Sequence, residues 1–366
     1  MFPPRFSSSL PGPPSSSSAD TAVRSTDLDA LLSRVSASQS GYSSDPFSPL
    51  FLPPAQRRNP DKRPPLINIG THARTWAVDR LVEQFLINTG VGEGQVQVLS
   101  MGAGTDTRFW RLRRRWEEEK ERLGKWRCRR WVEVDFPEAT GSKARVVSSK
   151  AELKGMLGEG EVKVELGGQG LSASLYALLP GDLRALPSLS RLLLSPPPSS
   201  PSADPILDPT LPTLLLLECV LVYLEPSDAE GVLRWFAETF SGSNPRDGSR
   251  GGAVACYDPF GLEDSFGQVM RRNLAARSLS LPSASSTPTL TSLVERLGAC
   301  GIKGECGSLS VKEIKEEVIP RGERDRVARI EQIDEVEELN LVLEHYAVTW
   351  GNLTSGVVGG IGLQKE

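Results

Sequence analysis

The chain has 366 residues, of which 39% are hydrophobic and 24% charged, and its formal net charge at pH 7 is −4. This size and composition are typical of one large domain with appendages, and the weak negative charge argues against a general attraction to nucleic acid or membranes. Five scattered cysteines and two histidines match no disulfide framework or metal-ligand pattern, so we expect no metal and a reducing, cytoplasmic environment. No apolar run reaches the ~20 residues that a membrane span needs.

The N-terminal part of the chain predicts a disordered segment followed by a lid. Residues 1–22 are rich in proline and serine and offer little to bury, so we expect no regular structure there. Residues 26–36 place leucines on one side of a short helix, and residues 41–47 predict an ordered turn. We expect residues 23–70 to form a lid on a single domain that extends to residue 366.

A long amphipathic helix is predicted over residues 68–88. Arg74 falls in its first turn, where a positive charge opposes the helix dipole. This placement suggests that an anion from outside the helix is the partner of Arg74, and a surface salt bridge is an equally good alternative.

The central feature is the stretch 96–110, VQVLSMGAGTDTRFW, in which an apolar run meets Gly102 and Gly104 before a helix begins. A buried strand that feeds a glycine turn leaves unpaired backbone N–H groups at a helix start, where anionic or polar ligand groups bind. Thr107 replaces the third glycine of the dinucleotide fingerprint, which favours a nucleoside without pyrophosphate over NAD. Alone, the glycine turn is weak evidence.

Acidic residues follow two further predicted strands. The strand 131–135, WVEVD, ends in Asp135, which could accept hydrogen bonds from both hydroxyls of a ribose. Asp182 and Leu183 follow the strand 174–180, where the carboxylate either faces the same edge of the sheet or caps the next helix. Both acids strengthen the prediction of a nucleoside site.

The continuous apolar run 213–219, TLLLLEC, predicts a strand that is covered on both faces. Glu218 lies near its end, and burial of this carboxylate would cost several kcal/mol unless it is paired. A cationic ligand would supply the pairing.

Three stretches are interpreted as insertions. Arginines and lysines gather near 111–130, but glutamates at helical spacing favour a solvated helix over a nucleic-acid patch. Residues 195–212 and 278–290 are rich in serine and proline and predict flexible surface loops.

The end of the chain predicts a strand over residues 252–258 and an antiparallel pair formed by residues 345–350 and 357–363. Strands alternating with helices, with an antiparallel pair at the end, favour an α/β fold with a class I methyltransferase (Rossmann-like) sheet and an added helical lid over a dehydrogenase sheet.

Several blocks together resemble the leucine carboxyl methyltransferases. They are INIGTHARTWAVDRLVEQFL, VLSMGAGTDTRFWRL, WVEVDFPEATGSKA, GDLRAL, LPTLLLLECVLVYLEP, DSFGQVMRRNL and RIEQIDEVEELNLVLEHYAVTWG. The combination of ECVLVY with VDFP is specific. The resemblance implies S-adenosylmethionine as methyl donor and the C-terminal leucine of the catalytic subunit of protein phosphatase 2A as acceptor. We also expect a monomer that contacts the phosphatase tail and neither nucleic acid nor membrane.

The resemblance also implies roles for single residues. Arg74 would grip the methionine carboxylate of the donor, and Arg34 would add a basic contact from the lid. The remaining matches are Gly102 at the glycine turn, Asp135 at the ribose, Asp182 and Leu183 beside the adenine, Glu218 on the strand before the active-site segment, and Tyr223 facing the acceptor.

Three alternatives stay open. A related methyltransferase acts on a modified guanosine of transfer RNA, but it normally carries a long repeat domain that this sequence does not show. A protein that binds the phosphatase without chemistry would have no reason to retain Gly102, Asp135 and Glu218 together. A NAD-dependent dehydrogenase is disfavoured by Thr107.

Overall fold

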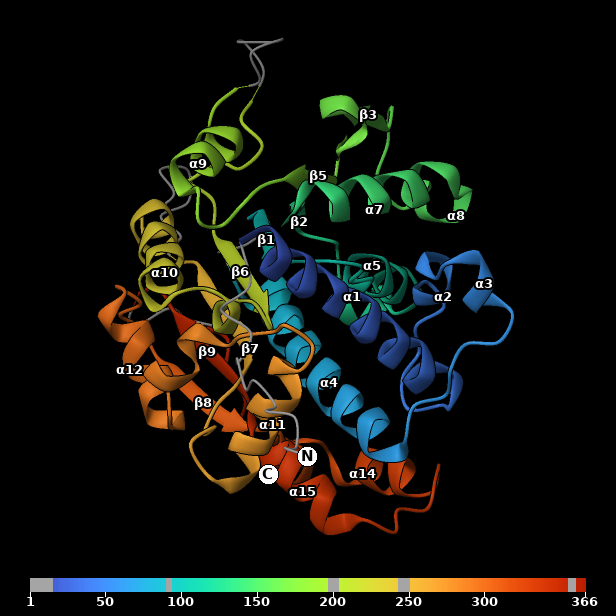
Figure 1. Cartoon of the computed structure of the whole chain (residues 1–366). Coiled ribbons are helices and arrows are strands. Elements are labelled where there is room, and N and C mark those ends of the chain that lie inside the picture. Colours follow the sequence, from blue (N-terminus) through green and yellow to red (C-terminus); the bar gives the residue numbers. More distant parts are fainter. Residues whose placement is uncertain (1–15, 90–93, 197–203, 243–250, 355–359) are drawn as a thin grey trace, which may run out of the picture.

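The computed structural model describes residues 16–89, 94–196, 204–242, 251–354 and 360–366. A nine-stranded sheet lies at the centre of the molecule (Figure 1). Its strands are β1 (Val96–Met101), β2 (Cys128–Asp135), β3 (Lys163–Glu165), β4 (Gly170–Ser172), β5 (Tyr176–Pro180), β6 (Thr213–Glu218), β7 (Ala253–Pro259), β8 (Cys306–Ser310) and β9 (Tyr346–Asn352).

The strand order is β3-β4-β5-β2-β1-β6-β7-β9-β8. The five central strands, β5 to β7 in that order, pair in parallel, whereas β9 pairs antiparallel with both β7 and β8. At the other side of the sheet, β4 pairs antiparallel with β5. A parallel centre with a reversed strand, β9, near one edge is the arrangement of a class I methyltransferase sheet, and it confirms the predicted fold class.

Helices cover both faces of the sheet. They are α1 (Ser16–Gln39), α2 (Ser48–Phe51), α3 (Pro54–Arg57), α4 (Pro65–Asn88), α5 (Arg108–Glu118), α6 (Lys120–Leu123), α7 (Pro137–Ser149), α8 (Ala151–Lys154), α9 (Leu186–Leu194), α10 (Pro226–Phe240), α11 (Ser265–Ala275), α12 (Leu290–Ala299), α13 (Val311–Glu313), α14 (Arg321–Ala328) and α15 (Val336–Glu344). Shorter turns are η1 (Leu166–Gly168), η2 (Leu221–Tyr223), η3 (Pro282–Ser286) and η4 (Ile314–Val318).

The apolar run of β6 explains the layering. Leu214 and Leu216 point into a core shared with α4, α5 and α7, whereas Leu215 and Leu217 point into a second core shared with α9, α10 and α12. A central parallel strand is apolar on both sides because helices cover both faces. Among the described residues, none of the helices is long and apolar enough to cross a membrane.

The lid begins earlier in the chain than predicted. Residues 16–22, expected to be disordered, form the first turns of α1, and the other residues of that segment, 1–15, lie outside the described part of the chain. The helix extends to Gln39 rather than covering only residues 26–36. It is long because Leu31, Leu32 and Val35 bury one side of it in the main core.

The three stretches interpreted as insertions contain more ordered structure than surface loops. Within residues 111–130 the chain continues α5, forms α6 and begins β2. The pairs Arg113–Glu117 and Arg114–Glu118 confirm the predicted solvated helix. In the second insertion, residues 197–203 lie outside the described residues, but Leu207 is fully buried in the core. In the third, the Ser283 hydroxyl donates to the Leu224 carbonyl at 2.6 Å, so this segment is anchored rather than flexible.

The predicted pairing at the C-terminus was wrong. The strand β9 pairs with β8, a segment that was not expected to be a strand, whereas residues 360–363 form no strand and residues 355–359 lie outside the described range. Gly307 in β8 is required by the residue opposite it in β9. A Cβ on Gly307 would come within 2.4 Å of the Trp350 ring, so the indole takes the place of a side chain there.

A buried ion pair supports the sheet beneath the glycine turn. Glu133 on β2 and Lys143 on α7 are each 1% exposed, with Nζ and Oε2 at 2.5 Å. The Tyr176 hydroxyl donates to the same carboxylate at 2.6 Å, and Lys143 also donates to the Asp106 carbonyl at 2.7 Å. Lys143 therefore connects β2 to the end of the glycine turn.

We predict that Lys143→Met lowers the free energy of unfolding by about 3–5 kcal/mol, because it leaves the Glu133 carboxylate buried without its cation. Urea denaturation at neutral pH measures the effect. Glu133→Gln combined with Lys143→Met should recover part of the loss, since the buried charge is then removed. A loss below about 1 kcal/mol in the single variant would contradict the assigned role.

Candidate functional site

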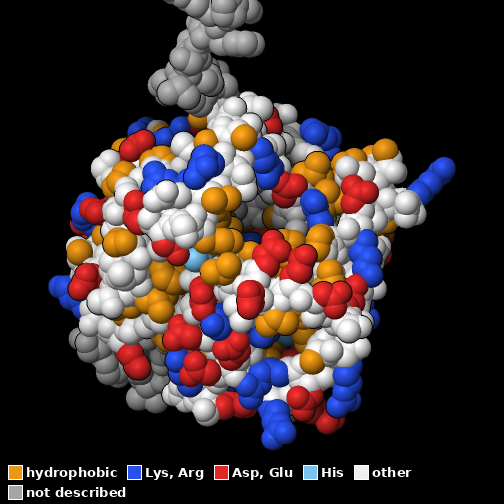
Figure 2. Space-filling model, turned by 60° about the horizontal axis from the view of Figure 1, so that its bottom comes forward, with side chains coloured by type: hydrophobic (Ala, Val, Ile, Leu, Met, Phe, Trp, Pro, Cys, Tyr) orange, Lys and Arg blue, Asp and Glu red, His pale blue; other side chains and the backbone are white. Residues whose placement is uncertain are grey.

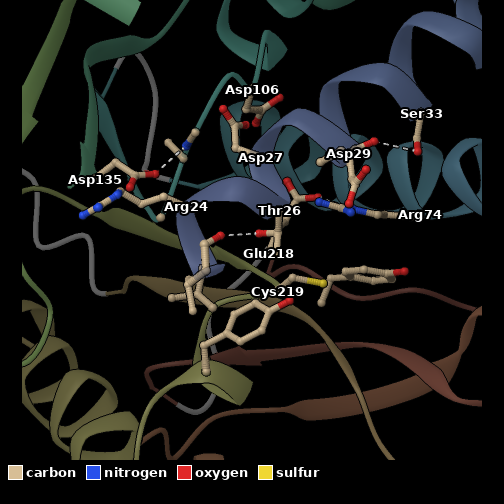
Figure 3. Close-up of a pocket in the computed structure, with 18 of the residues that line it drawn as sticks. Arg24, Thr26, Asp27, Asp29, Ser33, Arg74, Asp106, Asp135, Glu218 and Cys219 are labelled. Carbon is tan, nitrogen blue, oxygen red and sulfur yellow. Dashed lines mark hydrogen bonds and ion pairs between the residues drawn. The ribbon is translucent and has the colours of Figure 1, made fainter. Parts of the chain in front are cut away.

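A cavity of about 430 Å³ opens at the carboxyl ends of the central strands. It is bordered by residues from the ends of β1, β2, β5, β6 and β7 and by α1, α4, α11 and α15 (Figure 3). All of the predicted site residues line this one cavity, namely Arg34, Arg74, Gly102, Asp135, Asp182, Leu183, Glu218 and Tyr223. Its volume lies in the range typical of small-molecule sites.

The glycine turn has a different role from the one predicted. Its amides are already bonded within the protein: Gly102 N donates to the Val134 carbonyl at 2.8 Å, and Gly104 N donates to Asp135 Oδ2 at 2.7 Å. Thr105 N donates to Asp27 Oδ1 at 2.8 Å. The expected row of free N–H groups is therefore absent from these three positions, and side chains must hold any ligand here.

Both glycines are required by the turn itself. Their φ angles are +66° for Gly102 and +46° for Gly104, in the left-handed region that side chains disfavour. A Cβ on Gly102 would also approach Val220 Cγ2 to 2.5 Å, and one on Gly104 would approach Asp27 Oδ1 to 2.3 Å. The turn is thus pressed tightly between the active-site segment and the lid.

Asp135 has the geometry expected of a ribose acceptor. Its two oxygens accept hydrogen bonds from Gly104 N and, at 2.6 Å, from Phe136 N, which fixes the carboxylate at the tip of β2. A carboxylate has about four acceptor positions, so two remain for hydroxyl donors from the cavity. Burial raises the pKa of Asp135, while the two amides oppose this shift.

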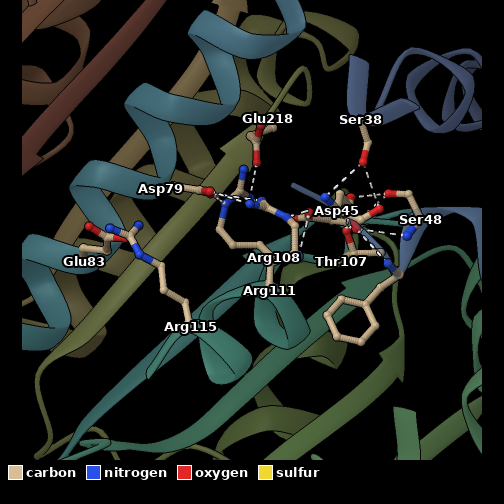
Figure 4. Close-up of polar contacts among 12 residues, drawn as sticks. Ser38, Asp45, Ser48, Asp79, Glu83, Thr107, Arg108, Arg111, Arg115 and Glu218 are labelled. Carbon is tan, nitrogen blue, oxygen red and sulfur yellow. Dashed lines mark hydrogen bonds and ion pairs between the residues drawn. The ribbon is translucent and has the colours of Figure 1, made fainter. Parts of the chain in front are cut away.

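Glu218 does not need a cationic ligand, contrary to the sequence-based argument. Arg74 Nε donates to its Oε2 at 2.8 Å, and Arg108 is bonded to its other oxygen (Figure 4). Burial alone would raise the pKa of Glu218, but Arg108 and Arg74 more than offset this effect and hold the pKa below its usual value. Glu218 is therefore an anion that orients two arginines.

Arg74 is likewise bound inside the protein rather than by an outside anion alone. Besides its bond to Glu218, its guanidinium lies 4.4 Å from the centroid of the Tyr257 ring. These contacts fix the side chain in the wall of the cavity, which it also lines. A guanidinium has five donors, so a ligand carboxylate can still bind to an oriented Arg74.

Arg108 is a buried residue that the sequence reasoning missed. It contacts Asp79 at 2.7 Å and Asp106 at 2.6 Å in addition to Glu218, and Arg111 contacts Asp79 at 2.5 Å. Arg111 had been grouped with a solvated cluster, but this network buries it. The sequence shows acids in the helix at 68–88 and in the turn at 102–108, but it does not show how these two segments pack. Which acid pairs with Arg108 could therefore not be predicted.

The lid helix α1 closes the cavity from above the sheet. Asp27 accepts from the amide of Thr105 and, at 2.7 Å, from its hydroxyl, and Arg34 donates to the same hydroxyl at 2.8 Å. Nearer its start, Asp20 pairs with Arg184 at 2.9 Å. Asp27 was not predicted, because its role depends on α1 crossing the glycine turn.

The predicted turn at 41–47 is ordered but does not line this cavity. Asp45 accepts from the amides of Phe47 and Ser48 and from the Thr107 hydroxyl at 2.7 Å. Thr107, the residue in place of the third glycine, is fully buried and anchors this turn behind the glycine loop. The turn therefore supports the site instead of covering it.

Asp182 does not cap the helix that follows it. Its carboxylate accepts from the backbone and side chain of Arg184, and α9 begins only at Leu186 with Ala185 as its N-cap. Hydrogen bonds from Arg184 hold the pKa of Asp182 below its usual value. Asp182 is thus an ionised acceptor beside Leu183 at the end of β5, in the wall of the cavity.

Tyr223 lies in the short turn η2, directly after β6. Val222, Leu274 and Leu281 belong to the same small apolar cluster, while Thr26 on α1 is hydrogen-bonded to the phenol. Burial raises the pKa of Tyr223 well above the ordinary value, against the opposing effect of Thr26. The phenol therefore stays protonated and can donate a hydrogen bond. The turn is shaped by Cys219, whose φ of +55° is rare for a residue other than glycine.

Comparisons with known proteins identify the family. The family model for leucine carboxyl methyltransferase matches residues 22–237. The protein named leucine carboxyl methyltransferase 1 from Cryptococcus neoformans var. neoformans serotype D (strain JEC21) is 42% identical, and the match covers 96% of this chain and 97% of that protein.

The chain belongs to the leucine carboxyl methyltransferase family. A protein of Arabidopsis thaliana named leucine carboxyl methyltransferase 1 homolog is 32% identical over 94% of this chain and 93% of its own length. Among solved structures, an O-methyltransferase family protein from Burkholderia thailandensis matches with a TM-score of 0.38 and 11% identity, covering 92% of this chain and 72% of that chain. Its membership of this family makes the protein a carboxyl methyltransferase.

In this leucine carboxyl methyltransferase, Asp258 at the end of β7 supports the turn that carries Tyr223. Its Oδ1 accepts from Val222 N at 3.4 Å, its side chain is 4% exposed, and its Oδ2 has no hydrogen-bond partner. Burial raises the pKa of Asp258 to about 7, against the opposing effect of Arg296. Ionisation of Asp258 therefore destabilises the folded state relative to the unfolded state.

We predict that Asp258→Asn changes the pH dependence of stability. A raised folded-state pKa stabilises the fold below the unfolded pKa and loses that contribution as the pH rises toward 7. Relative to the parent chain, the variant should therefore gain about 2 kcal/mol between about pH 5.5 and about pH 8.5. Urea denaturation at both pH values measures this difference, and Asp325→Asn on exposed α14 is the control. A difference independent of pH would contradict the shifted pKa.

Proposed function

We propose that this enzyme transfers the methyl group of S-adenosylmethionine to the α-carboxylate of the C-terminal leucine of the catalytic subunit of protein phosphatase 2A. The observation that carries the proposal is a single cavity with two distinct ends. Gly102, Asp135 and Asp182 lie at the tips of β1, β2 and β5, and Arg74 on α4 lines the same cavity, whereas Tyr223 lies on the turn η2 and apolar residues of α4 and α15 complete the lining.

The residues at the first end fit the donor. Asp135 keeps acceptor positions for ribose hydroxyls, and Asp182 beside Leu183 would contact the adenine. Arg74, oriented by Glu218, would bind the methionine carboxylate, with Arg34 on the lid as a second cation. When bound, the donor supplies a methyl group on a positively charged sulfur.

The residues at the second end have little proton chemistry to perform. A terminal carboxylate has a pKa of about 3.3–3.7, so the nucleophile is already ionised at neutral pH and needs no general base. The protein has to remove water from this carboxylate and aim one oxygen, and positioning of this kind can supply much of the acceleration. The protonated phenol of Tyr223 would hold the acceptor in place.

A closed cavity favours this reaction electrostatically. Opposite charges disappear as a carboxylate becomes an ester and a sulfonium becomes a thioether, so exclusion of water favours the transition state over the separated ions. The lid helix α1 would provide that exclusion.

We further propose that the enzyme is a monomer of the cytoplasm that recognises the phosphatase tail without nucleic acid, membrane or metal. All five cysteines are free, which supports a reducing environment.

The proposed reaction predicts a gain of one methyl group on the last residue of the phosphatase catalytic subunit after incubation with the enzyme and the donor. Mass spectrometry of the C-terminal peptide locates the group. A phosphatase that lacks its terminal leucine is the control and should gain nothing. An unmodified C-terminus would contradict the proposal, and strong, steeply salt-dependent binding to transfer RNA would revive the rival methyltransferase.

We also predict that Asp135→Ala and Arg74→Ala each weaken donor binding by about 10- to 100-fold, since a hydrogen bond to a charged group contributes about 1.5–3 kcal/mol. Calorimetry with S-adenosylmethionine measures the affinity. Arg80→Ala, on the same helix as Arg74 but outside the cavity, is the matched control. Tyr223→Phe should retain donor affinity while slowing methyl transfer. Unchanged affinity in the first two variants would refute the assignment.

A further inference from the structure

Consecutive residues of the lid helix α1 contact different parts of the cavity wall. Asp27 accepts hydrogen bonds from the amide and the hydroxyl of Thr105 in the glycine turn, at 2.8 and 2.7 Å. Thr26, the residue before it, is hydrogen-bonded to the phenol of Tyr223 on the turn η2. Thr26, Asp27 and Tyr223 all line the cavity. Helix α1 therefore joins the glycine turn to the turn that carries Tyr223.

The other hydrogen bond of Thr26 determines how it meets the phenol. Its hydroxyl donates to the Val23 carbonyl, three residues earlier in α1, at 2.7 Å (Figure 3). A threonine hydroxyl has one proton and two acceptor positions. Because this proton is bonded to Val23, Thr26 accepts from Tyr223. Burial raises the pKa of Tyr223, so the phenol keeps its proton and is the donor.

The apolar neighbours of Tyr223 hold its ring but give its hydroxyl no direction. Val222 and Leu281 lie in the same small cluster as the ring, and hydrophobic contact is non-directional. A hydrogen bond, by contrast, weakens steeply when donor and acceptor are misaligned. Thr26 therefore supplies a contact that fixes the direction of the phenol O–H.

The phenol lies toward the side of the cavity that α11 borders. Leu274 on α11 lines the cavity and belongs to the cluster of Tyr223. Figure 2 shows the face of the molecule on which α11 and α15 lie, and hydrophobic side chains border a hollow there. A ligand that approaches the phenol from this face does not require α1 to leave the glycine turn, so Thr26 can stay beside Tyr223 during the reaction.

We propose that Thr26 is a positioning residue for methyl transfer, which holds the phenol of Tyr223 in the orientation that meets the acceptor carboxylate. This inference rests on the proposed function, because it requires Tyr223 to hold that carboxylate. Thr26 itself would touch neither the carboxylate nor the methyl group. Its effect on the reaction would pass entirely through the phenol.

Thr26 can keep its bond to the phenol when the acceptor is present. Hydrogen bonds to an ionised group are about twice as strong as those between neutral groups, so the phenol proton turns from Thr26 to the carboxylate. The Thr26 hydroxyl then turns from Val23 to the phenol oxygen, since the Val23 carbonyl still accepts the backbone N–H four residues later in the helix. Two hydrogen bonds in a row strengthen each other, and Thr26 thereby tightens the hold of Tyr223 on the acceptor.

The test compares Thr26→Val, which has a similar shape but no hydroxyl, with Thr26→Ser, which keeps the hydroxyl. Ser25→Ala is the matched control. The Ser25 hydroxyl donates to the Ala22 carbonyl at 2.6 Å, as Thr26 does to Val23, but Ser25 does not line the cavity. Thermal unfolding checks that the variants fold.

The quantity measured is kcat/KM for the phosphatase catalytic subunit at saturating S-adenosylmethionine. Thr26→Val should lower it by about 3- to 10-fold, which is the effect of one hydrogen bond of ordinary strength. Thr26→Ser should recover most of this loss, and Ser25→Ala should stay within about twofold of the parent value. Donor affinity, measured by calorimetry, should stay within about twofold of the parent value in Thr26→Val, because Asp27 keeps its bonds to Thr105.

The double variant Thr26→Val with Tyr223→Phe separates positioning from general damage to the lid. If Thr26 acts through the phenol, its hydroxyl has no partner once Tyr223 is phenylalanine. The double variant should then match Tyr223→Phe alone within about twofold. A damaged lid would instead slow methyl transfer by the same factor in both backgrounds.

Three results would overturn the inference while leaving the proposed function intact. The first is parent activity in Thr26→Val, and the second is an equal effect of Thr26→Val with and without the Tyr223 hydroxyl. The third is a Thr26→Ser variant as slow as Thr26→Val. If the unaltered enzyme does not methylate the phosphatase, the proposed function fails and the inference fails with it.

Discussion

The site depends on one buried carboxylate. Glu218 ends the central strand β6, and its two oxygens bind Arg74 from α4 and Arg108 from the start of α5. A buried charge is tolerated only when it is paired and hydrogen-bonded, so this arrangement ties the sheet to both helices. Removal of Glu218 would take from Arg74 its carboxylate partner and would leave Arg108 with only Asp79 and Asp106. Arg74 is thus held in the cavity wall by a carboxylate that strand β6 positions.

Sequence patterns could predict the part of the site that lies at strand ends. The parallel strands β1, β2, β5 and β6 all end at one edge of the sheet, so Gly102, Asp135, Asp182 and Glu218 had to come together once those strands were recognised. Their chemical types then indicated a nucleoside. The resemblance to a family added Arg34 and Tyr223, and it named a partner for Arg74, which its position in a helix had already singled out.

The rest could not be predicted because it depends on contacts between distant segments. Asp27 matters only because α1 crosses the glycine turn, 78 residues away along the chain. Arg108 pairs with acids from three different elements, and β8 is recognisable only beside Trp350. Glu218 was assigned a cationic ligand for the same reason, because its partners Arg74 and Arg108 come from segments far away in the sequence.

The helix α1 is held very differently at its two ends. Its second half is anchored by Leu31, Leu32 and Val35 in the hydrophobic core. Its first half relies on ion pairs near the solvent, such as Arg24–Glu138 and Asp20–Arg184, each of which contributes roughly 0–1 kcal/mol. The first turns of α1 are therefore held by weaker contacts than the second half, so local opening of the helix would cost less free energy at its start than at its end.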